Sequence, residues 1–136
     1  MSERDDAAYF LAKAEESLAG AESEYANGRF NNCANRAYYA SFQAAIAALL
    51  RAGIGPSRQD NQWRHDHVQA RFAEQLIGRQ KRYPAERRDV LGRGAILRAT
   101  ADYRTDQVSQ LQALRGLRRS RDMVEAVRRR GGPDGT

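Results

Sequence analysis

The sequence has few of the residues that bridge, ligate or interrupt a small protein. Its 136 residues include one cysteine, two histidines and three prolines. A lone Cys33 excludes an internal disulfide, and no secretory hydrophobic segment precedes the first predicted helix, so we expect a cytoplasmic protein. His65 and His67 are two residues apart and lie on different helix faces. With Cys33 remote from both, the sequence predicts no metal site and no cofactor.

Strand-like alternation and long hydrophobic runs are also absent. The longest uncharged run extends from Ala37 to Leu50, in a chain in which 29% of the residues are charged. It is shorter than the roughly 20 apolar residues of a membrane-spanning helix, and Ser41 and Gln43 interrupt it. At helical spacing its large side chains fall on two sides, so other helices must cover both. The run therefore predicts the central helix of a bundle and no membrane association.

Apolar residues at spacings of three and four predict helices on either side of this run. We expect helices over about 5–27, 30–53, 63–77 and 84–103, and a fifth capped by residue 105 or 106. Gly28 suits the end of the first helix, and the turn after it is so short that the first two helices must be antiparallel. The fold class is all-α, an antiparallel up-and-down bundle of four to five helices. It forms a single domain over 1–130, followed by a disordered tail over 131–136.

Charge is divided unevenly along the chain. Residues 1–28 contain seven acidic and two basic side chains, whereas the net charge of the whole chain is +6. The arginine-rich remainder suits an anionic partner such as RNA, DNA or a nucleotide phosphate. A role of the arginines in solubility, or association of the acidic end of one chain with the basic end of another, explains this uneven charge equally well. In the last helix, Arg115, Arg118 and Arg119 recur at spacings of three and four, which predicts a nucleic-acid-binding strip or an ordinary solvated face.

Five short segments, in chain order, resemble the signatures of one family. They span residues 9–18, 28–32, 35–45, 65–68 and 98–103, and the most specific are NRAYYA at 35–40 and RxxADY at 98–103. Together they resemble small prokaryotic HEPN-domain proteins over about residues 7–128. The resemblance implies an antiparallel helical bundle, commonly a homodimer. It also implies a nucleotidyltransferase partner in a toxin-antitoxin or stress module, and in many relatives a metal-independent ribonuclease.

Catalytic relatives carry an arginine and a histidine four to six residues apart. Arg98 matches the arginine, but Asp102 and Tyr103 follow it and no histidine does. Arg98 and Asp102 stand four residues apart on one helix face, which predicts an ion pair. Our leading interpretation is a nucleotide- or RNA-binding module without the usual Arg/His ribonuclease motif. Its ligand-binding candidates are Asn35, Arg36, His65, Arg98, Asp102 and Tyr103.

A divergent endoribonuclease is the alternative, with Arg98 and His65 as catalytic candidates from the same or a partner subunit. Metal-free RNA cleavage needs one group to accept the 2′-hydroxyl proton, another to protonate the leaving oxygen, and a cation near the phosphorane. Histidine suits proton transfer near neutral pH, whereas an ionised Asp102 would repel the scissile phosphate. The absent histidine favours the binding module. A scaffold that binds neither nucleotide nor RNA is a third interpretation.

Overall fold

The computed structural model of the chain describes residues 3–79, 82–103 and 107–130. The elements in order are α1 (Glu3–Ala26), α2 (Phe30–Arg51), α3 (His65–Arg71), the π-helical η1 (Phe72–Arg79), the 3-10 helix η2 (Ala85–Asp89), α4 (Val90–Tyr103) and α5 (Gln110–Arg130). These residues contain no strand, so the predicted all-α bundle is confirmed. The predicted cap at 105 or 106 and the predicted tail over 131–136 lie outside the described residues.

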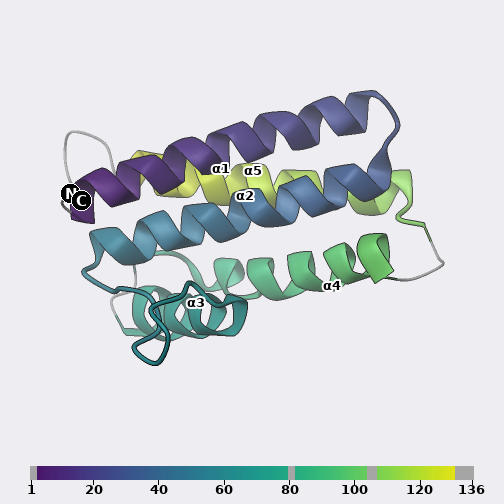
Figure 1. Ribbon diagram of the computed structural model, residues 1–136. Helices are drawn as coiled ribbons and strands as arrows, with labels where there is room; N and C mark the ends of the chain where they lie inside the picture. The colour runs from purple at the N-terminus through teal and green to yellow at the C-terminus, as the bar shows by residue number, and fades with distance from the viewer. Residues whose placement is uncertain (1–2, 80–81, 104–106, 131–136) are drawn as a thin grey trace.

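α2 is the central helix of the bundle, as predicted. Fourteen of its 22 residues are buried. α1, α5, α4 and α3 pack around it, and Figure 1 shows α1 and α4 on opposite sides of α2, with α5 behind. The alanines of α2 allow close approach of these neighbours, because a methyl group adds little to the distance between helix axes. No helix in the described ranges has the length and apolar content needed to cross a membrane.

Glycines in the left-handed backbone conformation end the first two helices. Gly28 has φ +74°, and its N–H donates to the carbonyl of Tyr25 at 3.0 Å while Arg29 N–H donates to that of Glu24 at 2.9 Å. Gly53, at φ +78°, repeats this pattern at the end of α2. Both are Schellman motifs, in which a residue without Cβ reverses the chain at little steric cost. The first of them makes α1 and α2 antiparallel neighbours (Figure 1).

The last three helices begin later than predicted, whereas the fourth ends at Tyr103, as predicted. The third helix begins at His65 and widens into a π-helix at Phe72, a turn that brings Leu76 and Ile77 to the buried side together. The fourth becomes α-helical only at Val90, after a 3-10 turn. The fifth begins at Gln110, because Ser109 and Gln112 form a reciprocal capping box. Gln112 N–H donates to Ser109 Oγ at 3.1 Å, and Ser109 N–H donates to Gln112 Oε1 at 2.9 Å.

Two isoleucines of different burial test the central role of α2. Ile46 in α2 is 1% exposed, whereas Ile96 in α4 is 72% exposed. We expect Ile46→Ala to lower the free energy of unfolding by about 2–5 kcal/mol, because it leaves a cavity. Ile96→Ala, the matched control, should change it by no more than about 0.5 kcal/mol. Denaturant unfolding measures both, and equal effects would contradict a core organised around α2.

Candidate ligand-binding site

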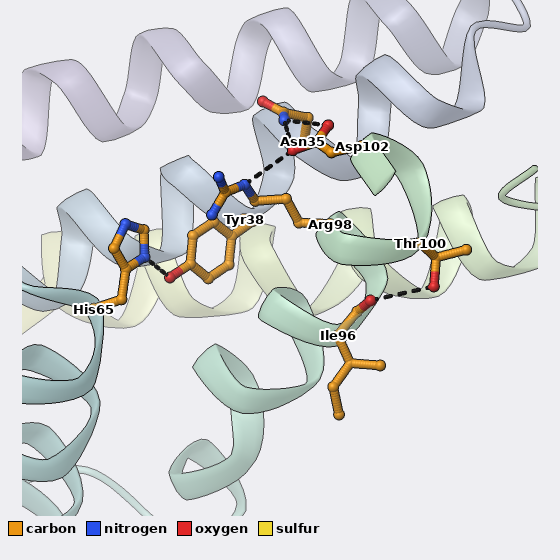
Figure 2. A network of polar contacts seen from close by, with 7 residues as sticks. All are labelled: Asn35, Tyr38, His65, Ile96, Arg98, Thr100 and Asp102. Carbon is orange, nitrogen blue, oxygen red and sulfur yellow. Dashed lines mark hydrogen bonds and ion pairs between the residues drawn. The ribbon is translucent and has the colours of Figure 1, made fainter. Parts of the chain in front are cut away.

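Asp102 joins α4 to the first half of α2. Arg98 Nε donates to Asp102 Oδ2 at 3.2 Å, so the predicted ion pair is confirmed. Asn35 Nδ2 lies 3.0 Å from both carboxylate oxygens of the same aspartate. The carboxylate therefore accepts hydrogen bonds from two helices, which fixes the orientation of the Arg98 side chain (Figure 2).

The guanidinium group of Arg98 lies over two tyrosine rings. Its central carbon is 5.5 Å from the ring centre of Tyr38 and 5.2 Å from that of Tyr39, which is cation–π geometry. The ion pair with Asp102 uses Nε, so it leaves the two terminal amino groups of Arg98 available to an anion. The side chain is 24% exposed. Arg98 is thus held in place while its side chain remains partly exposed.

His65 joins the same site from α3. Its Nδ1 and the hydroxyl of Tyr38 form a hydrogen bond, and Figure 2 shows the Tyr38 ring between His65 and Arg98. The imidazole also stacks on Phe42, with ring centres 4.4 Å apart and an interplanar angle of 11°. These contacts hold an exposed histidine in one orientation at the beginning of α3. The structure therefore brings an imidazole close to Arg98, although none follows Arg98 in the sequence.

The Tyr38–His65 pair is uncharged near neutral pH. Burial lowers the pKa of His65, the positive charge of Arg98 lowers it further, and Asp66 opposes both. Burial raises the pKa of Tyr38 to about 12, against the smaller effect of Arg98. Between a neutral imidazole and a neutral phenol, either group can be the donor: the Tyr38 hydroxyl can donate to Nδ1, or Nδ1–H can donate to the hydroxyl oxygen, depending on the histidine tautomer. The Nε2 atom of His65 takes no part in this hydrogen bond and is left for a ligand.

Two other candidates from the sequence lie differently. Arg36 does not reach Asp102, whose partner on α2 is Asn35. It lines a cavity of about 470 Å³ between α1 and α2, together with Lys13, Ser17 and Gln43 among others. The side chain of Tyr103 lies outside the described residues. The structure thus brings Asn35, Arg98, Asp102 and His65 together and leaves Arg36 on the α1 side of α2.

Sequence reasoning assigned Tyr38, Tyr39 and Phe42 to the core and missed their part in the site. The signal available was the pair of adjacent tyrosines, because a buried tyrosine hydroxyl usually needs a partner. Cys33 is fully buried, and its pKa is raised to about 11 by burial and by Glu24. Within the described ranges, no three His, Cys, Asp or Glu side chains form a group that could hold a metal ion.

The nucleic-acid-binding strip predicted from sequence lies on α5. Arg115 and Arg118 are exposed, whereas Arg119 is partly buried. Burial lowers the pKa of Arg119, and the positive charges of Arg93 and Arg115 lower it further. Arg93 belongs to α4, so a pattern read along α5 alone could not include it.

Two charge substitutions test the electrostatics of His65. We expect Arg98→Gln to raise the pKa of His65, because it removes a nearby positive charge, and Asp66→Asn to lower it, because it removes a negative one. NMR titration of the His65 ring protons in both variants measures the shifts. A His65 pKa that moves in the same direction in the two variants would contradict this assignment.

One comparison with known proteins found a match. The HEPN domain model matches residues 7–130, which includes both specific sequence motifs and every helix that forms the site. No curated protein matched the chain. A match over this much of the sequence, on an all-α bundle, shows that the chain belongs to the HEPN domain family.

Proposed function

We propose that this HEPN domain binds a nucleotide or RNA at the surface formed by Arg98, Tyr39 and His65. The observation that carries the proposal is the position of Arg98, held over Tyr38 and Tyr39 with its terminal amino groups outside the ion pair to Asp102. A guanidinium group fixed in this way can donate two parallel hydrogen bonds to a phosphate. Phosphate contact by Arg98 is therefore the first element of the function.

An aromatic ring beside the arginine extends the site from phosphate to base. The His65 ring stacks on Phe42, and the residue as a whole is exposed. Bases of single-stranded RNA stack on rings of this kind, including histidine. His65 Nε2 adds a hydrogen-bonding atom at the edge of that surface. A cation beside an exposed histidine is the pairing that a single nucleotide or an unpaired RNA segment requires.

The proposal includes the partners that the sequence motifs imply. These are a second copy of the chain, a nucleotidyltransferase and a cytoplasmic toxin-antitoxin or stress module. Family membership supports them. Arg115, Arg118 and Arg119 remain candidates for contact with the RNA backbone.

A metal-independent endoribonuclease is the second candidate. The observation that favours it is the contact of both Arg98 and His65 with Tyr38, which places a cation and a neutral imidazole in one site. His65 can accept the 2′-hydroxyl proton through Nε2. Two features oppose it: Tyr38, with a pKa of about 12, is a weak acid for the leaving oxygen, and Asp102 places a negative charge beside the phosphate. Binding is therefore the better-supported function.

Labelled single-stranded RNA in EDTA tests both functions in one titration. We expect Arg98→Gln to weaken binding by about 10- to 100-fold, because it removes charge-assisted hydrogen bonds to phosphate. Fluorescence anisotropy measures the affinity, and a gel of the same samples shows whether the RNA is intact.

Arg121→Gln is the matched control, because it removes the same charge from α5, where Arg121 lies 3.8 Å from Glu22 of α1. The affinity of this variant for the RNA should stay within about threefold of that of the wild type, because loss of an exposed ion pair changes the fold little. Equal binding by Arg98→Gln and the wild type would refute the site. Robust cutting by the wild type that is lost in both Arg98→Gln and His65→Gln would establish the second candidate.

A further inference from the structure

Three arginines gather where α4 and α5 pack against each other. The two helices run antiparallel (Figure 1), and they approach closely at Gly116, where a Cβ atom would lie 3.0 Å from Leu97 Cδ2 and 3.7 Å from Arg119 Nη2. Arg93 stands one turn before Leu97 on α4. Arg115 stands one turn before Arg119 on α5. The helix contact thus brings Arg93, Arg115 and Arg119, the arginine cluster, to one edge of the bundle.

Arg119 is the innermost member of the arginine cluster. It lines a small gap between α2, α4 and α5 with Val90, Gly94 and Tyr38 among others. Its partial burial lowers its pKa, and the positive charges of Arg93 and Arg115 lower it further, so Arg119 lies within electrostatic range of both. A group of like charges that is partly removed from water is unfavourable unless an anion balances it.

Among the described side chains, no acid forms an ion pair with a member of the arginine cluster. The acidic residue of α4, Asp102, is engaged by Arg98 and Asn35. On α5, Glu125 lies 3.9 Å from Arg128. Asp122 of α5 and Asp89, just before α4, stand within a turn of the cluster, but neither is in an ion pair with it among the described side chains. By contrast, Arg121 on the other side of α5 meets Glu22 of α1. The arginine cluster is therefore not held in an ion pair by a described side chain.

We propose that the arginine cluster is a second binding site, specific for a phosphate group. It is separate from the surface formed by Arg98, Tyr39 and His65, the Arg98 site. It shares Arg115 and Arg119 with the strip predicted from sequence and adds Arg93 from α4. Two helices provide donors from different directions, which surround a tetrahedral anion better than a row of arginines on one helix face. The phosphate can come from an RNA backbone or from a free nucleotide. Only the RNA source rests on the proposed function.

Thermal unfolding with inorganic phosphate tests the site without the Arg98 contribution. The full chain carrying Arg98→Gln is the reference, and sodium chloride matches the ionic strength. At a phosphate concentration ten times the dissociation constant, we expect the Tm to rise by about 3–6 °C, because phosphate binds only the folded state. Adding Arg119→Gln should abolish the rise, and adding Arg93→Gln should reduce it. Adding Arg121→Gln, which removes a matched charge, should leave it unchanged.

A second arm identifies the source of the phosphate. In the chain with Arg98 intact, Arg119→Gln should reduce the slope of log affinity for single-stranded RNA against log salt by about 0.7 relative to Arg121→Gln, if the cluster holds the backbone. A Tm rise with an unchanged slope supports the site and assigns it to a free phosphate. No Tm rise with phosphate, or an equal rise in the Arg119→Gln and Arg121→Gln variants, would overturn the proposal whatever the Arg98 site does.

Discussion

Burial of α2 is the constraint on which the rest of the structure depends. A helix with no charge from Ala37 to Leu50 is stable in water only when neighbours cover it, and α1, α3, α4 and α5 do so. Their positions around α2 decide which side chains meet at its surface. The Arg98 site forms where the first half of α2 is approached by α4 and by the beginning of α3. The site is therefore a consequence of how the central helix is covered.

Electrostatics divides the basic residues of the chain into two kinds. Some arginines pair with acids, as Arg121 does with Glu22 and Arg128 with Glu125. These exposed pairs contribute little to stability. Arg98 combines an ion pair with contact to two rings, and the arginine cluster forms no ion pair with a described side chain. Anion binding is expected at guanidinium groups of the second kind, because their charge is fixed in place and incompletely neutralised.

The sequence predicted features that depend on local spacing. The central helix, the antiparallel first pair and the Arg98–Asp102 ion pair all follow from residues close together in the chain, and all are present. The capping box at Ser109 and Gln112 was also readable, as a serine followed three residues later by glutamine, and it was missed.

Features that depend on packing between distant segments could not be predicted. The Tyr38–His65 hydrogen bond joins residues 27 apart and requires α3 to lie against α2 in one register. The meeting of Arg93 with Arg119 requires the register of α4 against α5. Neither register is encoded in a short motif. The sequence did name His65 as a candidate beside Arg98, but it did not show that both residues contact Tyr38.

The most direct test of the central claim is an NMR titration of the ¹⁵N-labelled protein with a short single-stranded RNA. The account predicts that the largest shift changes fall on Asn35, Tyr39, His65 and Arg98, which belong to three separate helices. Changes confined to the cavity lined by Lys13 and Arg36 on the α1 side of α2, with the Arg98 region unaffected, would contradict it.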